Sequence, residues 1–285
     1  MSDMNDVSAQ IPDNVEEWTF DGTQGEIAAR SWLSATDDPR YVAVLVHGYG
    51  EHIGRYDHVA AALIADGAVV YGLDHLGHGK SDGERVLVSN FDDVVTDLDR
   101  LVEQAQDVWP DLPLVMIGHS MGGMIAARYA QVHGEKLTAL VLSAAVIGAF
   151  ELIPQLLALD EMPDDPLPPE VLSRDPAVCE AYAADPLVWH GPFKRPTVVA
   201  MAAMIAAIDA DASVGALPLM WVHGEEDQLV PMEETRVGIE KLRGDSFRRH
   251  TYPGARHEVF NETNSDEVLA DVTAFVDAVL DGDDI

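Results

Sequence analysis

A sequence of 285 residues with 47% hydrophobic content can bury one large core and carry an inserted segment. Its 50 acidic residues outnumber the 17 Lys and Arg, and the formal net charge of −33 should repel nucleic acid and anionic membranes. The single cysteine, Cys179, excludes an intrachain disulfide framework and a cysteine-based metal site, and it favours a reducing, cytoplasmic compartment.

The excess of acidic side chains has two interpretations. It is either a solubilising surface or, as we favour, a halophilic adaptation to a cytosol of very high salt, because ordinary domains seldom carry so much charge of one sign. At 1 M salt the Debye length is about 3 Å, so the self-repulsion of an acidic surface would be screened. Lysine is correspondingly scarce, and the chain has only Lys80, Lys136, Lys194 and Lys241.

Residues 1–14 are polar and are expected to form a loose, acidic tail. The start of the chain has neither a basic segment nor an apolar one, so we expect no signal peptide. The chain also lacks an apolar run of about 18 residues, and we expect no transmembrane helix.

Beyond the tail, the hydrophobic pattern predicts strands that alternate with helices. Residues 16–20 and 27–33 flank a glycine-containing turn and are expected to pair as antiparallel strands. The strands expected after them span residues 41–46, 68–73, 114–117, 137–143, 217–222 and 247–252, and the helices span residues 56–65, 91–108, 121–130, 233–242 and 266–280. This alternation favours an α/β protein with a mostly parallel, doubly wound sheet.

The alternation is interrupted once. Residues 146–215 contain nine prolines and short helical runs, and a structureless loop of this length is unusual in a compact domain. We therefore expect a helical cap inserted over the sheet, with the core built from residues 15–145 and 216–285. Two apolar stretches of the cap, residues 150–159 and 198–208, either line an apolar pocket or pack the cap on the sheet.

The pentapeptide Gly118-His119-Ser120-Met121-Gly122 lies between an expected strand and an expected helix. In that context the G-x-S-x-G pattern is typical of a nucleophile elbow, a sharp turn that raises a serine above the sheet edge. Glycine at both ends removes Cβ atoms that would clash in the turn. Ser120 is therefore a candidate nucleophile, and the less favoured interpretation is a structural serine at a helix start.

A serine hydroxyl is a weak nucleophile unless a base removes its proton, so the chain must also supply a histidine and an acid. After such an elbow the acid comes next in the chain and the histidine last. Glu225, Glu226 and Asp227 follow one expected strand, and His257 follows the next. Because the carboxyl ends of parallel strands meet at one edge of a sheet, Asp227 and His257 are expected beside Ser120. A turn carboxylate and a surface histidine are the plain alternatives.

The tetrahedral intermediate of such a reaction requires backbone N–H donors, and losing one typically lowers the rate about 10²–10³-fold. One donor is expected from Met121, the residue after the nucleophile. The other is expected from the loop His47-Gly48-Tyr49-Gly50, in which Tyr49 is our choice. The glycines of this loop would allow its backbone to approach the serine.

Three further histidines invite a functional interpretation. His75 and His78 stand in a glycine-rich loop and could form a metal-binding pair, but no third ligand follows at a suitable spacing. We therefore favour hydrogen bonds that hold the loop and expect no metal site. His119, beside the nucleophile, is expected to have a positional role.

Several longer motifs now make a family resemblance plain. They are His47–His52 (HGYGEH), Asp74–Ser81 (DHLGHGKS), Gly118–Gly123 (GHSMGG), His223–Asp227 (HGEED) and Tyr252–Val259 (YPGARHEV). Together they resemble the monoacylglycerol lipase family of α/β-hydrolases, over roughly residues 20–280. The G-x-S-x-G pattern alone is common to many hydrolases, whereas this set of motifs is far more specific.

The resemblance implies an α/β-hydrolase fold and a lipase that cleaves monoacylglycerol to a fatty acid and glycerol without metal or cofactor. It implies the catalytic triad Ser120, Asp227 and His257, with Asp227 rather than its glutamate neighbours in the position of the acid. It also implies a cap that forms an acyl tunnel and makes transient contact with a lipid surface.

On the same resemblance, Glu51 and Arg55 would lie near the polar pocket for the glycerol head, and Tyr182 is a further candidate from the cap. The alternative for Glu51 and Arg55 is an exposed ion pair with each other. The sequence departs from the family where some members carry a second histidine, because Phe260 occupies that place. The strong acidity is a second departure, since many caps of the family have basic or neutral docking surfaces.

Other functions remain open at this stage. A lysophospholipase or a broad-specificity carboxylesterase is the nearest alternative. A ligand-binding receptor on the same scaffold belongs to a different class, and acyl transfer to an alcohol is a third reading. The sequence leaves open the acyl-chain preference and the oligomeric state.

Overall fold

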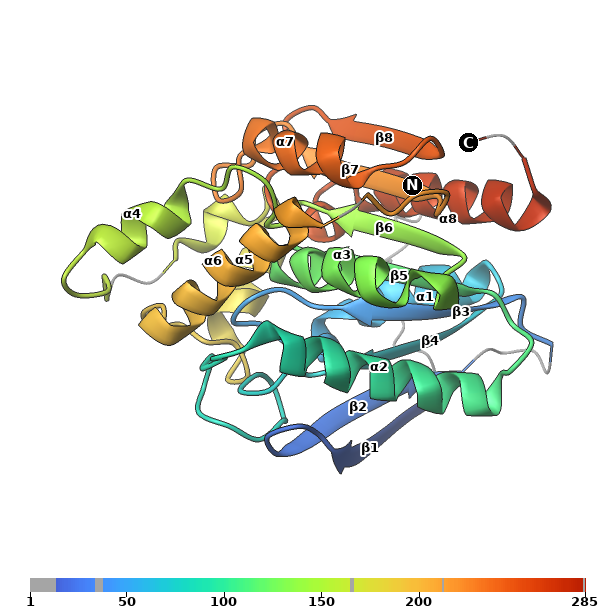
Figure 1. The fold of residues 1–285 in the computed structure, drawn as a ribbon, viewed down its shortest axis with the longest axis horizontal. Helices are drawn as coiled ribbons and strands as arrows, with labels where there is room; N and C mark the ends of the chain where they lie inside the picture. The colour runs from blue at the N-terminus through green and yellow to red at the C-terminus, as the bar shows by residue number, and fades with distance from the viewer. Residues whose placement is uncertain (1–13, 34–37, 165–166, 212, 284) are drawn as a thin grey trace, which may run out of the picture.

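The computed structural model describes residues 14–33, 38–164, 167–211, 213–283 and 285 (Figure 1). Its strands are β1 (Val15–Asp21), β2 (Glu26–Trp32), β3 (Tyr41–Val46), β4 (Ala68–Leu73), β5 (Leu114–His119), β6 (Ala139–Ser143), β7 (Leu219–Gly224) and β8 (Phe247–Tyr252). Its α-helices are α1 (Asp57–Ala65), α2 (Phe91–Val108), α3 (Met121–His133), α4 (Leu152–Ala158), α5 (Pro176–Ala184), α6 (Arg195–Ala210), α7 (Met232–Leu242) and α8 (Ser265–Asp281). Short 3₁₀ turns are η1 (Ile53–Tyr56), η2 (Gly134–Lys136), η3 (Pro169–Val171) and η4 (Val259–Asn261).

The eight strands form a sheet in the order β1-β2-β4-β3-β5-β6-β7-β8. The pairings from β4 through to β8 are parallel, and the first two pairings, β1 with β2 and β2 with β4, are antiparallel. The mostly parallel, doubly wound sheet predicted from the sequence is thus confirmed. The strand expected from residue 137 begins at Ala139, because η2 extends α3 and the Leu137 N–H donates to Gly134 O (3.1 Å).

Strand β3 illustrates how the sheet is covered on both faces. All six of its side chains are buried, and successive side chains point to opposite faces. Val44 belongs to a cluster with Leu98 of α2 and Ile125 of α3, whereas Leu45 belongs to a second cluster with Val272 of α8. The continuous apolar run in the sequence therefore marks a strand with helices on either side (Figure 1).

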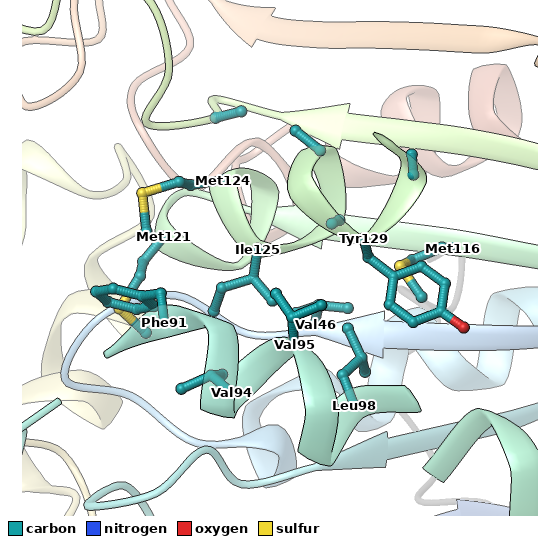
Figure 2. Packing of buried hydrophobic residues seen from close by; sticks show 14 of the residues in the cluster. Val46, Phe91, Val94, Val95, Leu98, Met116, Met121, Met124, Ile125 and Tyr129 are labelled. Atoms are coloured by element: carbon teal, nitrogen blue, oxygen red, sulfur yellow. The ribbon is translucent and has the colours of Figure 1, made fainter. Parts of the chain in front are cut away.

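Helices α2 and α3 pack against each other over one face of the sheet. Figure 2 shows Phe91, Val95 and Leu98 of α2 beside Ile125 and Tyr129 of α3. The three α2 residues stand at i, i+4 and i+7, which is the spacing of an apolar helix stripe. This packing anchors α3, and with it the turn that leads into its first residue.

Residues 144–218 connect β6 to β7, and we call them the inserted segment. Its helices α4, α5 and α6 gather beyond one end of the strands (left in Figure 1). Helix α6 packs against α2, α3 and α7 as well as against α4. Thr197 of α6 accepts a hydrogen bond from Val88 N (3.0 Å) and donates one to Val86 O (2.8 Å). The inserted segment is therefore fastened to the core through α6.

The predicted tail lies outside the described residues except for Asn14, whose carbonyl accepts a hydrogen bond from Leu33 N (2.9 Å). Strand β1 follows at once and pairs along its whole length with β2. Within the described ranges, every helix is too short or too polar to span a bilayer.

Candidate active site

The serine of the G-x-S-x-G pattern lies at the turn between β5 and α3. Ser120 has φ 56° and ψ −119°, a conformation that residues other than glycine seldom adopt. Its N–H donates to Ser143 O (2.9 Å) and its carbonyl accepts from Val146 N (3.1 Å), so the end of the neighbouring strand holds the strained turn. The turn has the geometry of a nucleophile elbow.

Close backbone approach requires the two glycines that flank this turn. A Cβ atom on Gly118 would lie 2.5 Å from Gly122 O, and one on Gly122 would lie 2.1 Å from Val46 O of β3. We expect Gly122→Ala to lower the free energy of unfolding by about 3 kcal/mol, because the backbone of Val46 and His47 leaves no room for a methyl group. Urea unfolding measures this loss.

Gly134→Ala, at the other end of α3, is the matched control. Gly134 has φ −59°, and a Cβ atom there would meet nothing within 4 Å. The control should leave stability unchanged or raise it slightly. Equal unfolding midpoints for the two variants would contradict the close approach at Gly122.

His257 bridges the serine and the acid. Ser120 Oγ–H donates to His257 Nε2 (2.9 Å), and His257 Nδ1–H donates to Asp227 Oδ2 (2.8 Å). These three side chains are buried, whereas Glu225 and Glu226 of the same loop are exposed. The structure therefore brings together the serine, the histidine and the one acid that the sequence favoured.

The carboxylate of Asp227 is surrounded by donors. Its Oδ1 accepts hydrogen bonds from Leu229 N and Val230 N (both 2.9 Å), and His223 Nε2 lies 3.2 Å from its Oδ2. Burial disfavours a charged carboxylate, but His257 and His223 outweigh that effect and hold the pKa of Asp227 well below its usual range. Asp227 is consequently ionised at neutral pH.

The Asp227 carboxylate in turn acts on the imidazole of His257. Burial lowers the pKa of His257, but the Asp227 carboxylate more than offsets this, and Glu258 and Glu51 add to its effect. The pKa of His257 is therefore raised above that of an ordinary histidine, which makes it a stronger base toward Ser120.

The two predicted oxyanion donors lie beside the serine. Tyr49 and Met121 both line the cavity that Ser120 borders. Met121 begins α3, and the N–H groups of a first helical turn have no acceptor within the helix. In the described part of the chain the Tyr49 N–H has no acceptor either, whereas the Gly48 N–H donates to Glu51 Oε1 (2.6 Å). Among the described residues both N–H groups therefore lack an acceptor, as the predicted oxyanion role requires.

A cavity of about 190 Å³ opens beside Ser120. The inserted segment supplies most of its apolar wall, including Phe150, Leu152, Ile153, Leu156, Leu167, Leu172, Val198 and Met201. Both apolar stretches identified in the sequence reach the cavity, and other members of them, such as Met204 and Ile208, belong to the core cluster. The two interpretations of these stretches therefore both hold, and residues such as Val198 and Met201 line the cavity and belong to the core cluster as well.

Glu51, Tyr182 and Glu258 also line this cavity and give it a polar end. Arg55 Nη1 donates to Glu51 Oε2 (2.6 Å) and Glu258 Oε1 (2.8 Å), and its Nη2 donates to Glu258 Oε2 (2.7 Å). The guanidinium also lies 5.0 Å from the centre of the Tyr182 ring. Arg55 itself is not among the described residues that line the cavity, so it reaches the cavity only through these partners.

The polar end differs from the sequence-based expectation in two ways. The Glu51–Arg55 pair is buried, with side chains only 5% and 10% exposed, so the alternative of an exposed ion pair is wrong. Glu258 was not predicted as a site residue. Burial would raise its pKa, but the adjacent Arg55 guanidinium lowers it to about 2. The available signal was its place directly after His257, in a loop at the same rim.

The remaining histidines make local contacts. The His75 N–H donates to His47 Nε2 (3.0 Å), and His78 Nδ1–H donates to the carbonyl two residues before it (3.0 Å). The His119 ring lies 4.7 Å from that of His257. Among the described residues, no group of three His, Cys, Asp or Glu side chains is placed to hold a metal ion. The contacts of His75 and His78 fit the loop-holding role favoured above.

Comparison with known proteins agrees with this geometry. The family described as serine aminopeptidase, S33, matches residues 37–264. A monoacylglycerol lipase of Mycolicibacterium smegmatis is 38% identical over 91% of this chain and 96% of its own, and a monoglyceride lipase of Mus musculus is 31% identical over 84% and 82%.

Among solved structures, a soluble variant of monoglyceride lipase from Saccharomyces cerevisiae in complex with a substrate analog superposes with a TM-score of 0.81. The match covers 96% of this chain and 97% of that one, and at 21% identity it speaks for the shared fold. The sequence relatives cover most of the chain, and the family match over residues 37–264 includes all three residues of the Ser–His–Asp arrangement. The chain belongs to the monoacylglycerol lipase family of serine α/β-hydrolases.

Proposed function

We propose that this protein hydrolyses monoacylglycerols to a fatty acid and glycerol, with Ser120, Asp227 and His257 as its catalytic triad. The observation that supports this most is the pair of hydrogen bonds made by His257, 2.9 Å to Ser120 and 2.8 Å to Asp227, at the wall of an apolar cavity with a polar end. The names of the relatives support the choice of substrate. The alternative is a lysophospholipase or a broad-specificity carboxylesterase.

In the first step Ser120 Oγ attacks the ester carbonyl carbon while His257 Nε2 takes the hydroxyl proton. Asp227 keeps the imidazole in the correct tautomer and stabilises the imidazolium that forms. The negative charge that develops on the carbonyl oxygen accepts hydrogen bonds from the N–H groups of Tyr49 and Met121.

The intermediate then collapses and breaks the bond to the glycerol oxygen, which takes the proton from His257 and leaves. Ser120 now carries the acyl group as an ester. A water molecule, deprotonated by the same imidazole, attacks this ester and releases the fatty acid and the free serine. These steps use no metal or cofactor.

The glycerol head group would bind at the polar end of the cavity, beside Glu51, Tyr182 and Glu258. Carboxylate oxygens only accept hydrogen bonds, so they suit the hydroxyl donors of glycerol. Two carboxylates and the single guanidinium of Arg55 carry a formal charge of −1, and the guanidinium is directed at the carboxylates. A phosphate would meet like charge here, so a neutral head group is favoured over an anionic one.

A comparison of head groups tests this substrate choice. We expect kcat/KM for a monoacylglycerol to exceed that for a lysophosphatidic acid with the same acyl chain by about 100-fold, because like charges across a desolvated contact cost several kcal/mol. Glu258→Gln removes one charge at nearly constant shape and should reduce this preference about tenfold.

Glu180→Gln is the control, because Glu180 is exposed on α5 and the substitution changes the net charge equally. It should leave the preference unchanged, which separates local charge from the field of the whole protein. Equal rates on the two substrates with the native enzyme would favour the lysophospholipase or carboxylesterase alternative.

We also propose that residues 146–215, which make up most of the inserted segment, act as a cap over a core of residues 15–145 and 216–285. It supplies the apolar wall of the cavity and so would enclose the acyl chain. Leu159 and Val199, on or next to α4 and α6, are 44% and 51% exposed. Such side chains support a transient contact of the cap with a lipid surface.

We further propose a cytoplasmic, halophilic enzyme, supported by the net charge of −33 and the single cysteine. Its thermal midpoint should rise as KCl increases from 0.1 M toward 3 M, because the Debye length falls to about 3 Å at 1 M and screens acidic self-repulsion. A sucrose series is the control, since sucrose stabilises by exclusion without screening charge. Equal stability at low and molar KCl would rule out the salt adaptation.

A further inference from the structure

Trp221 and His223 lie on the same face of β7, two residues apart and fully buried. Trp221 Nε1–H donates to His223 Nδ1 (3.2 Å), and the two rings meet edge to face with centroids 5.6 Å apart. An indole nitrogen can only donate, so His223 Nδ1 must accept. The proton of this imidazole is therefore on Nε2.

The other side of the His223 ring faces the loop of the catalytic acid. Its Nε2–H donates to Val230 O (2.9 Å) and lies 3.2 Å from Asp227 Oδ2. The Val230 N–H in turn donates to Asp227 Oδ1 (2.9 Å). One imidazole thus contacts both ends of the turn from Asp227 to Val230, and Oδ2, the oxygen beside it, is the one that binds His257.

We propose that His223 is a positioning residue for Asp227, and that Trp221 sets the tautomer it needs. Neither side chain is among the described residues that line the cavity, so neither is expected to touch the substrate. The opposite tautomer would turn a lone pair toward two oxygens, Val230 O and Asp227 Oδ2, and would push the turn away. This inference rests on the proposed catalytic role of Asp227.

Replacing His223 by leucine tests the proposal. We expect kcat to fall about 10–100-fold with little change in KM, because a small displacement of a positioned group is enough for such a loss. Asp227, Glu258 and Glu51 are the carboxylates that raise the pKa of His257. Of these three, only Asp227 is held in place by His223. Without His223 the carboxylate should raise the pKa of His257 less, so the acid limb of the pH profile of kcat/KM should move to lower pH.

His223→Gln is the rescue variant, because its amide N–H can still donate to Val230 O. It should recover most of the lost kcat and return the acid limb toward its native position. A purely structural role would instead appear as lower thermal stability with the acid limb unmoved. Native kcat and an unmoved limb in the leucine variant would overturn the proposal.

Trp221→Phe keeps the test decisive if the leucine variant fails to fold. It removes the indole donor, so ¹⁵N NMR should show His223 losing its single Nε2–H tautomer, and the acid limb should again move down. An unchanged tautomer with an unchanged limb would overturn the role of Trp221. The NMR measurement of the tautomer does not depend on catalysis. Failure of the proposed hydrolase function would therefore be seen separately, as native enzyme that does not hydrolyse monoacylglycerol.

Discussion

Ser120→Ala should lower kcat for monoacylglycerol hydrolysis about 10⁶-fold, the loss typical of removing a nucleophile from an intact triad. Ser120 is only 8% exposed, and in the described part of the chain its side chain makes a single hydrogen bond, to His257, so its loss removes chemistry rather than packing. The fold should survive, because backbone bonds to Ser143 and Val146 hold the strained turn. Fatty acid release and thermal melting measure the two effects.

Ser143→Ala is the matched control for this prediction. Ser143 is also buried, ends the next strand and bonds a histidine, since His119 Nδ1 lies 3.1 Å from its Oγ. The Ser143 variant should keep most of the activity. In the native enzyme a fluorophosphonate should label Ser120 and not Ser143. Turnover retained by the Ser120 variant would contradict the assignment. A native protein that resists labelling would favour the receptor alternative.

The convergence of Ser120, Asp227 and His257 could be predicted because it follows from topology. Each residue comes just after a strand, and β5, β7 and β8 run in the same direction in one sheet. Parallel strands bring their carboxyl ends to a common edge. Three residues far apart in the chain are therefore brought close by a pattern of apolar runs that the sequence displays.

The polar end of the cavity could not be predicted in the same way. Arg55 and Glu258 are 203 positions apart, and each stands near several alternative partners in the sequence. Which carboxylates a guanidinium takes depends on the packing of η1, η4 and the inserted segment, none of which has a hydrophobic period long enough to place it. The family resemblance implied that Arg55 lies near the head group, and its pairing with Glu51 was the alternative; the structure shows its donors used on Glu51 and also on Glu258.

The positioning of Asp227 by His223 could not be predicted from the sequence, for a related reason. His223 stands within a motif that marks the acid, so its type gave no separate signal. Its role depends on the indole of Trp221, and alternation places both on one face only because β7 runs to Gly224, two residues beyond the end expected from the sequence. The hydrogen bond to His223 gives Trp221, a buried core residue, a polar function as well.

Asp227→Asn should lower kcat about 10⁴-fold while leaving the geometry of the site nearly unchanged. An asparagine amide can donate to His257 Nδ1, which favours the tautomer with its proton on Nε2. That nitrogen then cannot accept the Ser120 proton over the 2.9 Å that separates the two atoms. The loss should fall on kcat rather than KM, because Asp227 does not line the cavity among the described residues.

The pH profile gives this prediction a second measurement. The native imidazole acts as a base only when neutral, and its pKa is raised because Asp227 outweighs the effect of burial. Native kcat/KM should therefore fall with decreasing pH through a value above the ordinary imidazole pKa of about 6.5. In the asparagine variant the main raising charge is gone, so the residual activity should persist to lower pH.

Glu226→Gln is the control for the asparagine variant, since it neutralises the neighbouring acid in the same loop. Glu226 is exposed, and its backbone N–H, which donates to Ala255 O (2.9 Å), is untouched by the substitution. Its kcat and acid limb should match the native enzyme. If the glutamine variant instead lost activity and the asparagine variant kept it, the acid of the triad would have to be reassigned, and the hydrogen bond from His257 to Asp227 would be structural only.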